Sequence, residues 1–330
     1  MGIYKDWLLE VLVRPPEPAP HESARGFWEA HRVRTAGLEP IDAAMIGGVS
    51  ADRLGWAFTA ALQAALRVLD PSLPAAAMAS LCATEARGVH PRDIQTTARR
   101  EGGEVVLDGE KVFVTLGAEA DVLLVVASTG HGEDGRNRLV VVRIAAGAPG
   151  VIREPAQRQL AIAPEISHRV VRFAGARAPE SAILPGDGYE DTLKPFRSVE
   201  DTYAFAAFLS YLCGVAWRSG WPEAFRERAI GAVLALRALA SGSTLRSPES
   251  HVALGGVLAL GREVADASEP LWESAGPEER ERWGRDRALL NVAAKARAAR
   301  LEAAWKRCAP TPPTCTPGPE GETGRTSPPG

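Results

Sequence analysis

The residue types that most often carry out chemistry are scattered through this sequence. The six histidines do not cluster at zinc-ligand spacing, and no Cys-x-x-Cys pair occurs. The four cysteines are Cys82, Cys213, Cys308 and Cys315. Zinc sites need closely spaced ligands, because several side chains must reach one ion. We therefore expect reduced thiols and no metal.

Nucleophile and phosphate-binding motifs are also missing. No Gly-x-Ser-x-Gly motif occurs, and we interpret the isolated His168 and His251 as surface or packing residues. The glycine pairs at 47–48, 102–103 and 255–256 fit neither a Gly-x-Gly-x-x-Gly motif nor a P-loop after a strand. The sequence therefore indicates no phosphate-cradling loop.

Two adjacent carboxylates, Glu200 and Asp201, precede a long apolar stretch and follow Ser198. A serine N-cap followed by acidic residues in the first turn stabilises a helix through its free N–H groups and its macrodipole. From local chemistry alone, this segment is interpreted as the start of a helix.

Composition is typical of a globular protein. The chain has 330 residues, 45% of them hydrophobic, and 38 Lys and Arg against 41 Asp and Glu, which gives a net charge of -3. A field this weak attracts neither nucleic acid nor an anionic membrane. The apolar run within residues 1–13 is too short and too charged for a signal sequence or a membrane span. We expect a cytoplasmic protein.

Hydrophobic periodicity divides the first half of the chain into three parts. Residues 1–24 are expected to be a loosely attached segment followed by a Pro-rich linker. Residues 25–83 are expected to be helical, with a break at residues 70–74 and a second helix over Ala75–Leu81. Residues 84–190 carry short β-rich runs without helices between them, which predicts an antiparallel sandwich or barrel.

The C-terminal part, residues 191–308, has four amphipathic stretches with short links, which predicts an antiparallel helical bundle. The stretches are Val199–Arg218, Glu223–Ala240, Pro248–Trp272 and Pro277–Arg307. Basic residues of the last stretch (Lys295, Arg297, Arg300, Lys306 and Arg307) are interpreted as a solvated face. Residues 309–330 are rich in Pro, Gly and Thr and are expected to be disordered. The predicted fold class is α+β.

Residues 81–128 carry the motifs of a known family. Thr84-Glu85 resembles a Thr-Glu-Pro motif, residues 107–111 (LDGEK) a Leu-Asn-Gly-x-Lys turn, and residues 113–115 (FVT) part of a Trp-Ile-Thr-Asn motif. With Pro185-Gly186 at the position of a later Pro-Gly element, the order and spacing resemble the acyl-CoA dehydrogenase family. The resemblance implies FAD, an acyl-CoA-like substrate of lipid metabolism, a carboxylate base, an electron-transfer partner and a homo-oligomer.

The resemblance also implies cofactor contacts by position. Leu81, Ala83 and Thr84 would line the pyrimidine edge of the flavin, and Phe113 and Thr115 would cover its ring. From the residues alone, Thr84 fits a turn, and Phe113 and Thr115 fit ordinary strand positions equally well. His90 stands where the family has a small hydroxyl, and it is either a ligand-contacting substitution or a loop histidine.

Two family elements have no clear counterpart. In the family, an Arg-x-x-Phe-Gly segment binds the cofactor diphosphate. Arg246 is the basic residue of this sequence nearest to that position, and it also fits a solvated loop charge. The Tyr-Glu-Gly-Thr loop that carries the usual base is imitated only by Glu320-Gly321-Glu322-Thr323 in the Pro-rich tail. Since some members place the base on the first bundle helix, Glu200 is the remaining candidate.

Three hypotheses follow from the resemblance. The first is a flavin-dependent oxidoreductase that dehydrogenates an acyl thioester and passes electrons to a redox partner. The second is a catalytically inactive relative that acts as a binding or scaffold subunit, paired with a paralogous subunit. The third is a flavin oxidation that uses oxygen.

Overall fold

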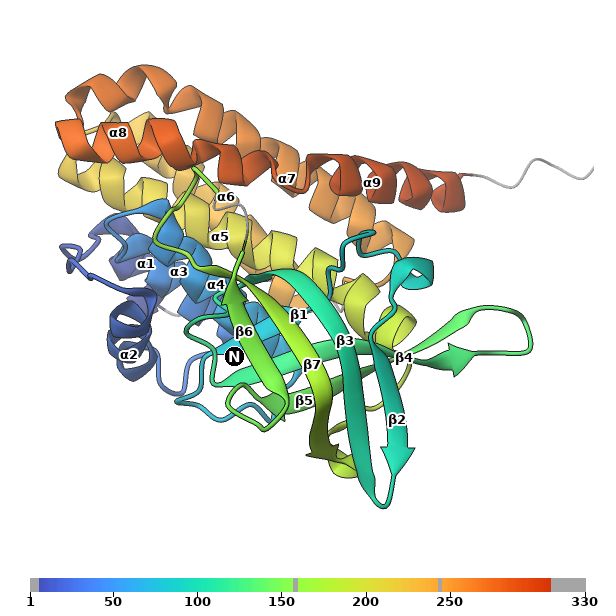
Figure 1. Ribbon diagram of the computed structural model, residues 1–330. Coiled ribbons are helices and arrows are strands. Elements are labelled where there is room, and N and C mark those ends of the chain that lie inside the picture. Colours follow the sequence, from blue (N-terminus) through green and yellow to red (C-terminus); the bar gives the residue numbers. More distant parts are fainter. Residues whose placement is uncertain (1–5, 157–159, 243–244, 310–330) are drawn as a thin grey trace, which may run out of the picture.

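The computed structural model describes residues 6–156, 160–242 and 245–309. In Figure 1, the N-terminal helices (blue) and the C-terminal helices (yellow to red) lie together, and a curled sheet (cyan to green) covers one side of them. This order confirms the predicted α+β class, with N-terminal helices, a central β-domain and C-terminal helices. Within the described ranges, no helix is long and apolar enough to cross a membrane.

The first helix, α1 (Asp6–Val13), is firmly packed. Leu8 and Leu12 are 0% and 2% exposed, and the helix contacts α3, α5 and α6. Residues at i and i+4 share one helix face, so these two leucines give α1 an apolar side to bury. The predicted loose attachment of this segment is therefore wrong.

Helices α2 (Ala24–Arg34), α3 (Pro40–Val49) and α4 (Leu54–Leu69) complete the N-terminal part. Helices α3 and α4 both pack on α5 (Lys194–Arg218), the first helix of the bundle. A Cβ at Gly48 would lie 2.1 Å from the Ala207 carbonyl oxygen, so only glycine permits this approach. The N-terminal and C-terminal helices thus share one hydrophobic core.

One seven-stranded sheet forms the middle of the chain. Its strands are β1 (Ala79–Cys82), β2 (Thr97–Glu101), β3 (Glu104–Thr115), β4 (Val122–His131), β5 (Asn137–Ala145), β6 (Val151–Pro155) and β7 (His168–Pro179). The order is β1-β4-β2-β3-β7-β6, with β5 paired to β4. Most pairs are antiparallel, but β4 pairs in parallel with β1 and β2. Successive β4 residues belong to two clusters: Leu124 and Val126 face the helices, and Leu123 and Val125 the second core.

The predicted helix over Ala75–Leu81 is wrong, because part of this run forms β1. The Met78 N–H donates to the Asp121 carboxylate at 2.8 Å, which starts the strand beside β4. A short apolar run that is buried on both faces has no distinctive periodicity, so only the partner strand decides its structure. This strand contains one predicted cofactor contact, Leu81, and two more, Ala83 and Thr84, follow it directly.

The remaining bundle helices are α6 (Glu223–Gly242), α7 (Pro248–Ala267), α8 (Pro277–Asp286) and α9 (Ala294–Cys308). The last predicted helix is divided, because a 3₁₀ turn over Arg287–Asn291 separates α8 from α9. The Leu290 carbonyl at this break accepts a hydrogen bond from Arg297. Residues 310–330, most of the predicted disordered tail, lie outside the described residues.

Candidate functional site

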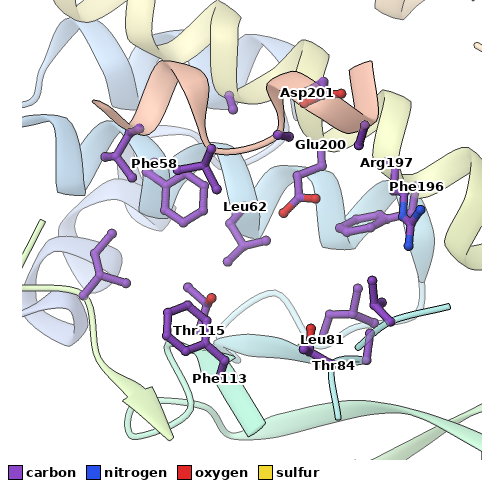
Figure 2. Close-up of a pocket in the computed structure, with 18 of the residues that line it drawn as sticks. Phe58, Leu62, Leu81, Thr84, Phe113, Thr115, Phe196, Arg197, Glu200 and Asp201 are labelled. Carbon is purple, nitrogen blue, oxygen red and sulfur yellow. The ribbon is translucent and has the colours of Figure 1, made fainter. Parts of the chain in front are cut away.

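A cavity of about 450 Å³ lies between α4, α5, the sheet and the start of α9. This volume is within the range of small-molecule sites, roughly 300–1,000 Å³. Figure 2 shows its arrangement: Phe58 and Leu62 come from α4, and Phe196 and Glu200 reach down from α5. Opposite them lie the residues of the sheet. The walls are mainly apolar, with a few polar groups that face inward.

The sheet side, called the floor here, consists of Leu81, Ala83, Thr84, Phe113 and Thr115. The Val112 N–H donates to the Thr84 carbonyl at 2.8 Å, which holds the segment after β1 against β3. Neither threonine hydroxyl has a hydrogen-bond partner among the described residues. Two hydroxyls in a mainly apolar cavity are therefore available to a ligand.

Phe113 reaches the cavity through an irregular part of β3. Its φ of 62° is unusual for a residue with a Cβ, and the register of β3 against β7 shifts between Lys111 and Val114. The ring lies 4.3 Å from that of His168, measured between centroids. His168 also lines the cavity, and burial lowers its pKa, which favours the neutral form of the ring. Strained backbone at a cavity is typical of functional positions.

A buried ion pair connects the two segments that form the floor, β3 and the segment after β1. Lys111 Nζ lies 2.6 Å from Glu85 Oε1, and the two side chains are 0% and 8% exposed. The Glu85 carboxylate also accepts the N–H groups of Gln95 and Thr96 at 2.7 and 3.0 Å. Burial favours a raised pKa, but Lys111 and these N–H groups outweigh it and hold the pKa of Glu85 below its usual range. This carboxylate joins β3 to both ends of the loop that follows β1.

Opposite the floor, the N-terminal part of α5 supplies the charged groups. Asp187 is the N-cap of the helical segment here, since its carboxylate accepts the N–H groups of Tyr189 and Glu190 at 2.8 Å each. Ser198 is instead a buried residue inside α5, and its hydroxyl lies 3.3 Å from His251 Nε2. The capping interpretation of Ser198 is therefore wrong, because the helix begins earlier. Glu200 is free for another role.

Glu200 is half-buried, and its carboxyl group points into the cavity (Figure 2). It forms no hydrogen bond or ion pair with any described residue. Desolvation, and then the charge of Asp201, raise the pKa of Glu200 to about 7, although Arg197 acts in the opposite direction. A carboxyl group with this pKa can take up and release a proton near neutral pH.

Asp201 has a structural role. Its carboxylate oxygens lie 3.1 Å from Arg297 Nη1 and 2.5 Å from Arg300 Nη2, which fastens α9 to α5. Arg297 is buried and Arg300 half-buried. The interpretation of the α9 cations as a solvated face is therefore wrong for these two arginines, because they neutralise a buried carboxylate.

The segment before β7 closes the remaining side of the cavity with Leu160, Ile162, Ala163 and Ile166. The Ala163 N–H donates to the buried Asp286 carboxylate of α8 at 2.7 Å. The same carboxylate pairs with Arg285 at 2.7 Å. The end of α8 therefore fixes this wall.

The other sequence candidates lie away from the cavity lining. His90 is exposed, and its ring accepts the Arg92 N–H at 3.4 Å, while the adjacent Val89 lines the cavity. Arg246 is exposed and donates to the Asp191 carbonyl at 2.9 Å. Residues 320–323 lie outside the described residues.

Sequence reasoning missed Arg197 and His168 as cavity residues. Arg197 could have been found from its spacing, because it stands three residues before Glu200 and thus on the same helix face. His168 had no local signal, since it meets Phe113 only through the pairing of β3 and β7.

Comparison with known proteins supports the family resemblance of the motifs in residues 81–128. Residues 80–173 match the family model for the acyl-CoA dehydrogenase middle domain. Acyl-CoA dehydrogenase FadE12 of Mycobacterium tuberculosis is 31% identical over 104 residues, which are 32% of this chain and 26% of that protein. An acyl-CoA dehydrogenase of Bacillus subtilis is 29% identical over 98 residues, 29% of this chain and 25% of that protein. The match spans about a quarter of the length of these relatives.

Solved structures show that the fold is shared along most of the chain. The prolyl acyl carrier protein oxidase AnaB has a TM-score of 0.65 at 13% identity, over 92% of this chain and 97% of that chain. PigA with FAD and proline has a TM-score of 0.62 at 16% identity, over 87% of this chain and 89% of that chain.

Proposed function

The chain belongs to an acyl-CoA dehydrogenase-like family, and from this premise we propose that it is a flavin-dependent oxidoreductase that dehydrogenates the α and β carbons of an acyl thioester. The observation that carries the proposal is the position of Glu200. Its carboxyl group faces the cavity from α5, across from a floor with an aromatic ring and two hydroxyls that have no hydrogen-bond partner among the described residues.

The floor fits a flavin ring. Leu81 and Phe113 offer apolar surface for the planar ring system, and the Thr84 and Thr115 hydroxyls are free to bond its polar edge. When bound, FAD supplies the acceptor for the β-hydride. The backbone and side chains of Leu81, Ala83, Thr84, Phe113 and Thr115 are the proposed contacts.

Proton removal is assigned to Glu200. Its ionised carboxylate takes the α-proton of the acyl group, the β-hydride leaves to the acceptor, and a C=C bond forms between the two carbons. Side chains such as Phe58, Leu62 and Phe205 exclude water, which keeps the carboxylate poorly solvated and therefore basic. The two electrons then pass to a redox partner.

The proposal is tested by anaerobic mixing of the FAD-loaded protein with a panel of acyl thioesters. We expect at least one thioester to bleach the visible flavin band, with an α,β-unsaturated thioester as product. If the flavin binds but none of the panel reduces it, dehydrogenation of acyl thioesters is the wrong reaction.

Activity is expected to depend on the ionisation of Glu200. Its pKa of about 7 means that the carboxyl group is protonated, and so unable to accept a proton, in more acidic solution. The rate of flavin reduction should rise about tenfold per pH unit below pH 7 and level off above it. Single-turnover rates from pH 5 to 9 check this. A rate that is constant over this range would exclude Glu200 as the titrating base.

Removing one hydroxyl from the floor is expected to weaken flavin binding. Thr115→Val keeps the shape of the side chain but loses a hydrogen bond that contributes about 0.5–1.5 kcal/mol, so the Kd of FAD should rise about threefold to tenfold. Flavin fluorescence titration measures this Kd. Thr129→Val, at an exposed position of β4, is the matched control. Equal Kd values for both variants would remove Thr115 from the cofactor site.

A non-catalytic binding or scaffold subunit is the second candidate. Its support is Arg246, the only sequence candidate for gripping a cofactor diphosphate, which donates to the Asp191 carbonyl instead of standing free. Failure to bind FAD would favour this candidate. Oxygen as the final electron acceptor is a variant of the first proposal, supported by the oxidase named among the similar structures.

A homo-oligomer is also proposed. Val292 and Trp305, at either end of the α9 region, are 71% and 58% exposed, and a second copy of the chain could cover them.

A further inference from the structure

The charged side chain of Arg197 has no bonded partner among the residues that the structure describes. Its side chain lines the cavity and is half-buried, yet it forms no hydrogen bond, ion pair or cation–π contact with any described residue. Two other arginines of the bundle, one half-buried and one buried, do have a carboxylate: Arg218 pairs with Glu279 and Arg237 with Asp42. Burying a charge without a partner costs free energy that a ligand can recover.

The position of Arg197 fixes where such a ligand group would lie. Residues three apart on a helix have Cβ atoms about 5–6 Å apart, so Arg197 and Glu200 are neighbours on the cavity side of α5. Figure 2 shows both side chains reaching toward the cavity. Their charged groups are nevertheless not paired, since no ion pair joins them. A group held by Arg197 would therefore lie close to the carbon that Glu200 deprotonates.

The surroundings of Arg197 restrict the chemistry of that group. Leu193, Phe196 and Ala204 of the same wall are apolar, so a single anion at the end or side of an apolar chain matches this wall. The phosphates of coenzyme A or a carrier are separated from the thioester by the pantetheine arm, and the diphosphate of FAD is separated from its ring by the ribityl chain. A carboxylate on the acyl group itself lies nearest to the reacting carbons.

We propose that Arg197 binds an anionic oxygen group, and that this group is a carboxylate carried by the acyl chain of the substrate. The substrate class is then a monothioester of a dicarboxylic acid. This inference rests on the proposed function for its reaction, but the binding preference can be measured without turnover.

Calorimetry with unreactive thioether analogues of glutaryl-CoA and pentanoyl-CoA tests the proposal. The two chains have equal length and differ in the terminal carboxylate. A charge-assisted hydrogen bond to Arg197 should make the glutaryl analogue bind about 10- to 100-fold more tightly. Arg197→Gln should abolish the difference and leave pentanoyl binding unchanged, and Arg197→Lys should restore part of it.

Arg262→Gln is the matched control. Arg262 is also half-buried and without a hydrogen bond or ion pair among the described residues, but it lines a neighbouring groove between α7 and α9 and not the cavity. This variant should keep the full preference for the glutaryl analogue. A similar loss in both variants would mean that net charge, and not Arg197, sets the preference, and would overturn the proposal.

Two further arms distinguish the source of the anion. If Arg197 held a phosphate of coenzyme A, Arg197→Gln would weaken both CoA analogues equally and leave N-acetylcysteamine analogues unaffected, which overturns the proposal. If the glutaryl analogue of N-acetylcysteamine still binds more tightly than the pentanoyl analogue, the proposal is supported. All titrations are repeated without added FAD, so a chain that binds no flavin can still show the carboxylate preference. If the wild-type chain binds the glutaryl and pentanoyl analogues with equal affinity, with or without FAD, the inference is overturned.

Discussion

Glu200→Gln is expected to slow the reduction of bound flavin by an acyl thioester by a factor of about 10²–10⁴, the usual contribution of a positioned general base. The amide has nearly the shape of the carboxyl group but cannot accept the α-proton. Of the two acidic residues that line the cavity, Asp201 is neutralised by Arg297 and Arg300, whereas Glu200 has no hydrogen bond or ion pair with a described residue. Stopped-flow absorbance of the flavin band measures the rate.

The controls for this variant are its flavin affinity and its stability. Glutamine carries no charge to desolvate, so Glu200→Gln should be no less stable than the wild-type chain above pH 7, where Glu200 is ionised. Glu263→Gln, on an exposed position of α7, is the matched substitution and should leave the rate unchanged. Wild-type rates in Glu200→Gln would show that another group removes the proton.

Glu85→Gln is expected to lower the free energy of unfolding by about 3–5 kcal/mol, because it leaves the Lys111 ammonium buried without a counter-charge. The Lys111 side chain is 0% exposed, and its Nζ has one other acceptor among the described residues, the Ala83 carbonyl at 3.4 Å. Since this pair supports the floor, flavin affinity should fall as well. Urea denaturation monitored by tryptophan fluorescence measures the stability.

A double variant separates the loss of the pair from the loss of the fold. Glu85→Leu combined with Lys111→Met replaces two charges by apolar groups and should recover much of the lost stability. Because the pKa of Glu85 is lowered in the folded chain, its contribution to the free energy of unfolding is present above its ordinary pKa of 4.5 and is lost as the pH falls below that value. A cost below about 1 kcal/mol for Glu85→Gln would show that solvent screens the pair, as at exposed sites.

The sequence brought together the residues that form the floor of the cavity, because they belong to short motifs, and their contact with a flavin stays a prediction. Thr84, Phe113 and Thr115 lie in strands and turns whose letters and spacing are local, and the structure places all three at one cavity. His90 belongs to the same stretch but lies on the surface. Adjacent residues there point in different directions, and it is Val89 that faces the cavity.

The errors arose where a distant partner decides the structure. The sequence of β1 fits a helix as well as a strand, and its pairing with β4 makes it a strand. The attachment of α1 could not be predicted, because α1 packs on helices far along the chain. Ser198 had every local sign of an N-cap, but Asp187 begins the helical segment earlier. Arg297 and Arg300 resembled a solvated face because their partner, Asp201, lies on another helix.

Titration of the purified chain with FAD, followed by visible absorbance, tests the central claim most directly. We predict that the flavin bands shift and sharpen as the ring enters the apolar cavity, and that the change saturates at one flavin per chain and is weakened by Thr115→Val. A spectrum that remains the sum of free FAD and protein at every ratio would contradict the flavoprotein assignment and leave the scaffold subunit as the better account.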